Sequence, residues 1–331
     1  MLFADPCENM PFLTICIPTF NRADYLERTL NSIVSQKYFL NTSDVEIIIS
    51  DNCSSDSTET ISRRYVALYS GKIIYSKNSI NTKDRNFELS LSKGKGEYLK
   101  LNTDYQEHID GSLEFIVNEV KANLEYRPNL FFMNGSLGLN EKISNSGRDD
   151  FLSLTSHYST WIGMYGIWRI DFESIKEFGR AADFQLAQLD NIYRVLAIKP
   201  DFVIIDVKIF RSANLKSNRN YDLLTIFLDN YNQVLSSHVE VGGIKQKTLN
   251  QDTKKVLLMF ICGWAARSSL GLDASFVIER HWRRIFSYCN PDLPLFAHYI
   301  CKYFKNWCSF FYERSYRQVC DVLFNRKVVK E

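Results

Sequence analysis

The 331-residue sequence predicts an α/β fold: a mostly parallel β-sheet with helices on both faces, followed by a helical C-terminal region. Up to about residue 135, short apolar runs rich in β-branched residues alternate with segments of helical apolar spacing, a pattern typical of parallel βαβ units. After residue 221, apolar residues recur only at helical spacing. We therefore expect a first domain over residues 1–215 and a helical region over residues 216–331.

The expected strands are short and apolar, and most of them end in a polar turn. The clearest are FLTICIPTF, residues 12–20, and VEIIISDN, residues 45–52. Further strands are expected over residues 72–78, 97–102, 129–135 and 201–210. Long apolar runs of this kind indicate strands that are buried on both faces of the sheet.

The expected helices lie between these strands and after them. In residues 23–36, Leu26, Leu30, Ile33 and Val34 fall on one helical face. The other expected helices cover residues 57–69, 85–92, 112–124, 184–198, 221–237, 253–269, 274–287 and 294–324, the last with a break. Residues 140–158 are polar and contain glycine, so we expect a mobile loop there.

Polar residues gather where the expected strands end. Parallel strands place their carboxyl ends at one edge of the sheet, and ligands of such sheets bind outside that edge. We therefore expect the binding site among the polar residues at this edge. They are Pro18, Thr19, Asn21, Arg22, Ser50, Asp51, Asn52, Asn78, Asn102, Thr103 and Asp104.

Charge and cysteine usage limit the classes of partner. The net charge of +2 argues against nucleic-acid binding by the chain as a whole. Residues 280–331 nevertheless hold ten basic and four acidic residues among many aromatics, which predicts a surface that meets an anionic partner. The eight cysteines form no CxxC pair, and no signal peptide or run of about 20 apolar residues is seen. We expect a cytoplasmic protein with reduced cysteines.

Three segments together resemble family-2 glycosyltransferases with the GT-A fold. They are LTICIPTFNRADYLERTLNSIVSQ, DVEIIISDNCSSDST and NSINTKDRNFELSLSKGKGEYLKLNTD, in the order and spacing of the family. Within the family, NSINTKDRNF is similar to the branch that includes abequosyltransferases and related dideoxyhexose transferases of O-antigen synthesis. The resemblance covers residues 12–115, and residues 220–331 add nothing to it.

The resemblance implies that the strand-end residues bind a nucleotide-sugar donor. Asp51 would accept a hydrogen bond from the base or the ribose, with a helix N-cap as its alternative role. Asp84 or Arg85 would lie beside the base or diphosphate, although Asp84 can also be a simple helix cap. The remaining residues expected to contact the nucleotide are Pro18, Thr19, Asn21, Arg22, Asn52, Asn102 and Thr103.

Asn102, Thr103 and Asp104 stand where the family carries a metal-binding DxD motif, so an amide replaces the first carboxylate. Asn102 can still bond a ribose hydroxyl, and Asp104 is expected to bind Mg²⁺ or Mn²⁺. Mg²⁺ commonly uses one or two carboxylates together with substrate phosphates and waters. We therefore expect a metal that arrives with the donor, and a metal-free site is the alternative.

An inverting sugar transfer also needs a base that takes the proton of the acceptor hydroxyl. The family places it at a helix start, often as Glu-Asp, whereas ADFQLAQLDN, residues 182–191, has no such pair. Asp190 is the preferred candidate and Asp183 the second; a solvated helix residue or a helix cap is the alternative for each. Trp161 and Tyr165 either form a platform for the acceptor sugar or belong to the core.

The expected function is that of an inverting glycosyltransferase of lipopolysaccharide (O-antigen) biosynthesis. It would move a sugar, such as a deoxyhexose, from a nucleotide-sugar donor to a lipid-linked oligosaccharide. It would work at the inner face of the cell membrane, with its basic C-terminal helices on an anionic lipid surface. Packing of those helices on the body or on a second subunit is the alternative. The rival function is a non-catalytic nucleotide-sugar-binding or scaffold protein of a glycan-assembly complex.

Overall fold

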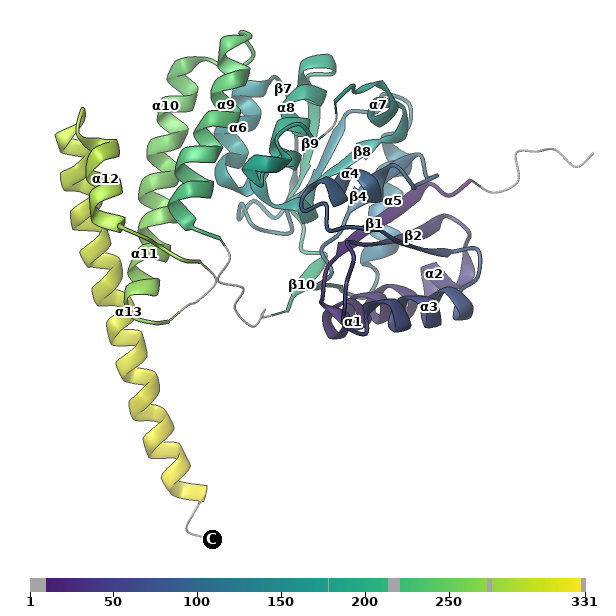
Figure 1. Cartoon of the computed structure of the whole chain (residues 1–331), viewed down its shortest axis with the longest axis horizontal. Helices are drawn as coiled ribbons and strands as arrows, with labels where there is room; N and C mark the ends of the chain where they lie inside the picture. Colours follow the sequence, from purple (N-terminus) through teal and green to yellow (C-terminus); the bar gives the residue numbers. More distant parts are fainter. Residues whose placement is uncertain (1–9, 178, 214–220, 273–275, 329–331) are drawn as a thin grey trace, which may run out of the picture. The chain divides into compact units, whose positions relative to one another are not determined.

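A computed structural model describes residues 10–177, 179–213, 221–272 and 276–328, with side chains described as far as residue 314 (Figure 1). Contacts within the chain divide it into two compact units. The first contains Met1–Asn214 together with Ser237–Lys245, and the second contains Leu215–Ser236 and Gln246–Glu331. This division departs from a single cut near residue 215, because residues 237–245 group with the first unit.

The first unit is built on a five-stranded sheet in the order β3-β2-β1-β4-β8. Its strands are β3 (Ile73–Lys77), β2 (Val45–Asp51), β1 (Leu13–Thr19), β4 (Tyr98–Leu101) and β8 (Gly166–Trp168). The first four run parallel, and β8 is antiparallel to β4. Every residue of β1 and β2 is buried, as their uninterrupted apolar runs predict.

Helices cover both faces of this sheet (Figure 1). Alternate residues of β1, such as Leu13 and Ile15, share one apolar core with helices α1 (Ala23–Val34) and α5 (Ser112–Ala122). Helix α4 (Arg85–Leu91) adds no residue to that core, yet it contacts β1, β2 and β4, so it covers the opposite face. Helices α2 (Lys37–Asn41) and α3 (Thr58–Leu68) complete this part. The predicted α/β class is confirmed.

A smaller sheet follows, in the order β6-β9-β7. Strand β6 (Asn129–Phe132) runs parallel to β9 (Asp201–Ile205), and β7 (Lys142–Ser146) runs antiparallel to β9. The expected mobile loop over residues 140–158 is therefore wrong, because it holds β7 and helix α6 (Arg148–Thr155). Strand β7 is mostly exposed and lacks an apolar signature, so only its backbone pairing with β9 defines it.

Short elements carry the chain between the sheets. The 3₁₀ turns are η1 (Ser156–Thr160), η2 (Ile162–Met164) and η3 (Ala182–Phe184); the helices are α7 (Arg169–Ser174) and α8 (Ala187–Ile198). The strand expected over residues 201–210 is two separate strands, since β10 (Phe210–Ser212) pairs with β5 (Gln106–His108) instead. This pairing connects the segment after β9 to the loop that follows β4.

The second unit is helical in its described part, as expected. Its elements are the π-helical turns η4 (Thr225–Asn230) and η5 (Val256–Ile261), and the helices α9 (Tyr231–Glu240), α10 (Gln246–Lys255), α11 (Cys262–Ser269), α12 (His281–Cys289) and α13 (Leu293–Val328). Helix α9 continues into the segment that groups with the first unit. The expected break within residues 294–324 does not occur, because α13 is continuous over this range. Pro294 lies in its first turn, where a missing N–H costs nothing.

Among the residues that the structure describes, we find no helix both long and apolar enough to cross a membrane.

Candidate active site

Asp104 lies at the centre of a polar cluster where β1 and β4 end. Asp104 Oδ2 accepts a hydrogen bond from Thr19 Oγ1 at 2.9 Å, and Oδ1 accepts one from Arg22 Nη1 at 3.0 Å. The main-chain oxygen of Asp104 accepts a third bond, from Thr29 Oγ1 of α1 at 3.0 Å. The parallel pairing of β1 with β4 brings these residues together, because it aligns Cys16 of β1 with Leu101, the last residue of β4.

The Arg22–Asp104 pair is buried at one end and open at the other. Asp104 is 2% exposed, whereas 26% of the Arg22 side-chain surface reaches solvent. Burial raises the pKa of Asp104, and the charge and hydrogen bonds of Arg22, with the bond from Thr19, oppose this shift. The Arg22 guanidinium also lies 5.5 Å from the centre of the Tyr105 ring. The outer end of the pair is therefore positively charged.

Asp51, at the end of β2, is fully buried. Its Oδ1 accepts the Ser54 backbone N–H at 2.8 Å, and its Oδ2 accepts the Tyr75 hydroxyl at 2.7 Å. Burial and the neighbouring Asp51 raise the pKa of Tyr75. Asp56, not Asp51, bonds the first residue of α3, through the Thr58 N–H at 3.0 Å. Asp51 thus orders the turn after β2, and its alternative role as the helix cap is not observed.

Asn52 holds the neighbouring loop instead of pointing outward. It is buried, its Nδ2 donates to Asn81 Oδ1 at 2.9 Å, and its Oδ1 accepts the Thr82 N–H at 2.8 Å. Asn86 of α4 similarly bonds the Ser50 backbone oxygen at 2.8 Å. Sequence reasoning missed the roles of Asn81 and Asn86, for which only the density of asparagines in this segment gave a signal.

The residues at the start of α4 differ from a simple cap. Asp84 makes no capping hydrogen bond with its side chain. It is half-buried, and desolvation raises its pKa to about 6 although the charge of Lys83 opposes the shift. Arg85 is exposed. The capping alternative for Asp84 is therefore not observed.

Asn21 and Pro18 frame the turn between β1 and α1. Pro18 is buried within β1, and Asn21 is exposed. Asn21 adopts a left-handed conformation with φ of 52°, and its Oδ1 accepts the Ser55 N–H at 2.8 Å. This bond ties the turn after β1 to the turn after β2, so the two strand ends are held side by side.

Asn102 is turned into the protein. It is 1% exposed, its Nδ2 donates to the Thr103 backbone oxygen at 2.9 Å, and its Oδ1 lies 3.2 Å from His108 Nε2. Burial and the nearby charge of Lys100 lower the pKa of His108 to about 3, so this imidazole is neutral. The prediction of a ribose contact is therefore not supported for Asn102. Thr103 Oγ1 is buried and has no hydrogen-bond partner in the described part of the chain.

The two candidate bases have very different surroundings. Asp190 of α8 is buried and accepts two bonds from Arg180, from Nε and Nη2, each at 2.8 Å. A third bond, at 2.9 Å, joins Asp190 Oδ1 to His238 Nε2, a partner that the sequence gave no means to foresee. Burial acts to raise the pKa of Asp190, but the hydrogen bonds from His238 and Arg180 outweigh it and lower the pKa. Asp183, in η3, is exposed.

The predicted acceptor residues belong mainly to the interior. Tyr165 is 1% exposed, so its ring has no face open to a sugar, and the platform role is not supported for it. Its hydroxyl is buried without a partner among the described residues. Trp161 is partly buried, and its ring meets the ring of Phe210 edge-on at 6.4 Å.

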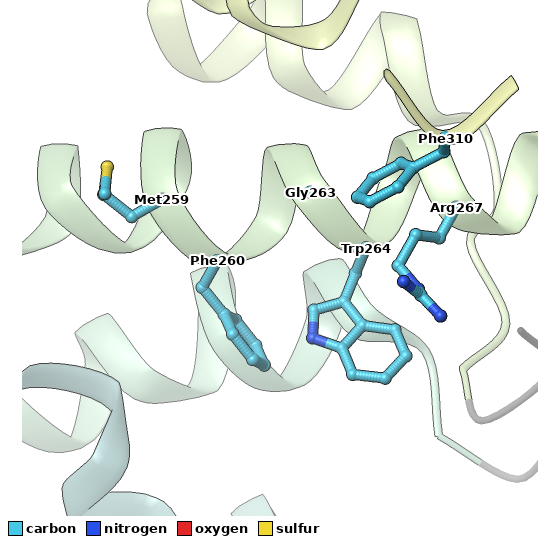
Figure 2. Close-up of a pocket in the computed structure, with 6 residues that line it drawn as sticks. All are labelled: Met259, Phe260, Gly263, Trp264, Arg267 and Phe310. Carbon is cyan, nitrogen blue, oxygen red and sulfur yellow. The ribbon is translucent and has the colours of Figure 1, made fainter. Parts of the chain in front are cut away.

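A separate hollow of about 420 Å³ lies in the second unit. Figure 2 shows the aromatic rings of Phe260, Trp264 and Phe310 around it, with the Arg267 guanidinium beside them. Arg267 lies 5.1 Å from the centre of the Phe310 ring. The hollow lies between residues of η5, α11 and α13, and its remaining lining residues are Met259 and Gly263. Its lining is thus mainly apolar and aromatic, with one cationic side chain.

Comparisons with known proteins place the first part of the chain in context. Residues 14–145 match the family described as Glycosyl transferase family 2. The chain is 47% identical over 87 residues to the abequosyltransferase RfbV of Salmonella typhimurium, 26% of each chain. It is 32% identical over 119 residues to the GalNAc(5)-diNAcBac-PP-undecaprenol beta-1,3-glucosyltransferase of Campylobacter jejuni, 35% of this chain and 36% of that protein. These matches thus span a quarter to about a third of the relatives' length.

Solved structures extend the likeness in fold over most of the chain. S. aureus TarS 1–349 in complex with UDP is 16% identical with a TM-score of 0.53, covering 92% of this chain and 91% of TarS. The mannosyltransferase PcManGT from Pyrobaculum calidifontis, in complex with GDP-Man and Mn²⁺, is 16% identical with a TM-score of 0.54. That match covers 91% of this chain and 88% of the mannosyltransferase. The expected GT-A fold is thereby confirmed.

Proposed function

We propose, from the premise that residues 14–145 form a glycosyltransferase family 2 domain, that this protein transfers a sugar from a nucleotide-sugar donor. The acceptor we propose is a lipid-linked oligosaccharide of surface polysaccharide synthesis. The observation that carries the proposal is the convergence of Thr19, Arg22, Asp51 and Asp104 at the carboxyl edge of the parallel sheet. All four lie within the segment that matches the family.

The donor fits this edge by charge and by position. Asp51 ends β2 and pairs in register with Thr19 of β1, so the two lie on adjacent strands. Because both oxygens of Asp51 are bonded within the protein, we propose that the base or ribose lies over the turn that Asp51 orders. The diphosphate would then lie toward Arg22, whose guanidinium suits phosphate oxygens. Two of the solved structures of similar fold hold UDP and GDP-Man, which supports a nucleotide ligand for a protein of this fold.

The chemistry we propose is a single displacement with inversion. The acceptor hydroxyl oxygen forms a bond to the anomeric carbon while the bond from that carbon to the diphosphate oxygen breaks. The acceptor proton passes to a carboxylate, and Asp183 and Asp190 are the candidates. The leaving nucleoside diphosphate takes the electron pair of the broken bond, so positive charge beside the diphosphate lowers the barrier.

The residues present do not fit a bound divalent metal as they are arranged. Both oxygens of Asp104 accept hydrogen bonds, from Thr19 and Arg22, and the Asn102 amide is directed inward. Within the described ranges, no group of three or more His, Cys, Asp or Glu side chains could hold a metal ion. The expectation of Mg²⁺ or Mn²⁺ therefore depends on a rearrangement of Arg22, and no step above requires it.

The helical unit supports a lipid-linked acceptor and a peripheral position at the inner face of the membrane. Its exposed aromatic side chains include Trp282, Phe286, Phe304 and Phe311, and Arg283 and Lys305 are exposed beside them. Aromatic and basic side chains together favour the interface of an anionic membrane. The printed name of the C. jejuni relative contains PP-undecaprenol, which agrees with this class of acceptor.

A donor screen tests the proposed function. We expect one nucleotide sugar in a panel of UDP-, GDP-, CDP- and dTDP-sugars to raise the melting temperature of the full chain. Saturating ligand at a hundred times its dissociation constant contributes about 2.7 kcal/mol to the free energy of unfolding. The same nucleotide sugar should be hydrolysed slowly without acceptor. If no member of the panel stabilises the protein, the proposal is wrong.

The scaffold function is the second candidate, and two observations favour it. Asp190, a candidate base, is held by three hydrogen bonds within the protein. Asn102 stands where the family carries a carboxylate. Tight nucleotide-sugar binding with neither hydrolysis nor transfer to lipid-linked acceptor from a polysaccharide-producing cell identifies the scaffold. Turnover in either assay excludes it.

A further inference from the structure

We infer that the guanidinium of Arg22, fixed by Asp104, is the cation that this site presents to the donor diphosphate, in the place of a divalent metal ion. The inference rests on the donor site proposed above. It assigns Arg22 a contact with the reacting group and makes Asp104 the residue that positions it.

The donor atoms at this edge are the first reason. A protein site for Mg²⁺ offers one or more carboxylate oxygens with room for waters and phosphates. Here each carboxylate oxygen of Asp104 already accepts one hydrogen bond, from Thr19 Oγ1 at 2.9 Å and from Arg22 Nη1 at 3.0 Å. The neighbouring amide of Asn102 donates to the Thr103 oxygen and is directed away from the edge. The positive charge of Arg22 at Oδ1 opposes the approach of a metal ion to Asp104.

The orientation of the ion pair is the second reason. Asp104 is 2% exposed and Arg22 is 26% exposed, so the negative end is covered and the positive end reaches solvent. The hydrogen bond from Nη1 to Asp104 Oδ1 holds the guanidinium, and the centre of the Tyr105 ring lies 5.5 Å from it. A planar guanidinium recognises two phosphate oxygens at once, which a hydrated ammonium does not. The pair therefore presents a fixed positive group at the carboxyl edge of the sheet.

Transfer of a sugar leaves an additional negative charge on the diphosphate. A preorganised cation stabilises that charge without reorganising during the reaction. Arg22 can do this because Asp104 and the turn after β1 already hold it. Asp104 itself touches Arg22 and Thr19, so its effect on the reaction passes through them.

The test measures binding of UDP, GDP, CDP, dTDP and inorganic pyrophosphate to the full chain by calorimetry, in EDTA and in Mn²⁺. We expect pyrophosphate and one nucleoside diphosphate to bind in EDTA, with affinities that Mn²⁺ changes by less than about twofold. Arg22→Gln should weaken both in EDTA by about tenfold or more, the loss of a charge-assisted bond. Arg22→Lys should retain part of the affinity.

Arg28→Gln is the matched control. Arg28 lies on the same helix, is 53% exposed and pairs with Glu107 at 3.7 Å, so its loss should leave binding unchanged. Arg22→Gln leaves Asp104 buried without its cation, so the double variant Arg22→Gln/Asp104→Asn guards against a folding defect. The double variant should be folded and should bind pyrophosphate and the nucleoside diphosphate weakly, with and without Mn²⁺. The single variant Arg22→Gln should instead gain Mn²⁺-dependent binding, because Asp104 Oδ1 is released.

Each remaining outcome counts against the inference. Wild-type binding that requires Mn²⁺ overturns it and leaves the proposed transferase intact. Unchanged affinity in Arg22→Gln, with EDTA present, also overturns it. If no nucleotide binds under either condition, both the inference and the proposed function fail.

Discussion

Asn102 shows why one residue of the family motif differs here. Its amide nitrogen donates to the backbone oxygen of Thr103, and its amide oxygen faces the neutral His108. A carboxylate at this position would face a carbonyl oxygen with no proton to donate, deep in the protein. The sequence reveals the substitution, but only the structure shows which groups the amide meets.

The residues hardest to assign from sequence are those whose side chains make hydrogen bonds within the protein. The strand-end position of Asp51, Asn52 and Asp104 is predictable from apolar runs that stop at polar residues. Their partners come from distant segments: Tyr75 for Asp51, Asn81 for Asn52, and Arg22 for Asp104. No spacing rule links these residues, because the pairs form only when the sheet assembles.

Asp84 gives a prediction about pH. Its pKa in the folded state is raised to about 6 by desolvation. A carboxyl whose pKa is raised in the folded state binds its proton more tightly there than in the unfolded chain. Its contribution to the free energy of unfolding is therefore favourable below the unfolded pKa and is lost as pH rises through about 6. Asp84→Asn should therefore stabilise the protein at pH 7.5 by about 1–2 kcal/mol and change little at pH 4. Urea unfolding at both pH values measures this, and equal effects at both contradict it.

The two candidate bases can be separated by two readouts. Asp190→Asn removes the charge that pairs with Arg180, so we expect a loss of about 1–3 kcal/mol in unfolding free energy. Asp183→Asn changes an exposed side chain and should leave stability unchanged. The variant that lacks the base should lose about 10²- to 10⁴-fold in transfer rate and retain donor affinity. If neither variant slows transfer, the base is another residue.

At the scale of elements, Gly96 controls how closely the chain before β4 approaches β1. A Cβ at Gly96 would lie 2.7 Å from the backbone nitrogen of Thr14 and 2.9 Å from the Leu13 carbonyl carbon. The Gly96 N–H also donates to Thr14 Oγ1 at 2.8 Å. Any side chain here would push β4 away from β1, and with it Asp104 from Thr19.

Gly96→Ala should therefore lower the unfolding free energy by about 2–4 kcal/mol and weaken nucleotide binding together. The same change at Gly263, in α11, is the contrast. Its added Cβ would meet nothing closer than 4.0 Å, so helix propensity should raise stability by about 0.5–1 kcal/mol. Thermal and urea unfolding of both variants compare the two sites. Similar changes in stability would mean that the close approach of Gly96 to Thr14 is not the cause of the destabilisation.

Periodicity predicted the central elements because their residues are buried on a regular face. It failed for β7, which is mostly exposed and is defined by its backbone pairing with β9. It also joined β9 and β10, since Val207 and Ile209 alternate with charged residues and continue a strand-like pattern, although the two strands belong to different sheets. Backbone pairing and changes of sheet leave little trace in side-chain pattern, which is why these elements were missed.

At the scale of the whole molecule, the exposed aromatic residues of the helical unit are the feature that a membrane would meet. The helical unit exposes Phe304 and Phe311 by 55% and 45%, among basic residues. Arg284 does not belong to this surface, because it pairs with Asp222 and Asp229. Reversal of its charge would therefore disturb the fold of the unit and would say nothing about lipids.

We expect the protein to float with vesicles that contain anionic lipid, and less so as salt rises. Phe304→Ser/Phe311→Ser and Arg283→Glu/Lys305→Glu should each reduce flotation by severalfold, because apolar burial and attraction to anionic lipid both contribute. Tyr126→Ser is the control, an 81% exposed aromatic of the first unit. A folded protein that stays unbound at low salt shows that these aromatics pack against protein instead.

Residues 237–245 matter for any attempt to dissect the protein. The chain leaves the first unit near residue 214 and returns to it at Ser237 before it leaves again. On the return, His238 bonds Asp190, and the Lys245 backbone N–H bonds Asp149 Oδ1 at 2.9 Å. The first unit is thus discontinuous in sequence. A truncated protein that ends at residue 215 has every strand of its sheets but lacks these contacts to α6 and α8, so loss of activity on truncation is no measure of what the distal helices do.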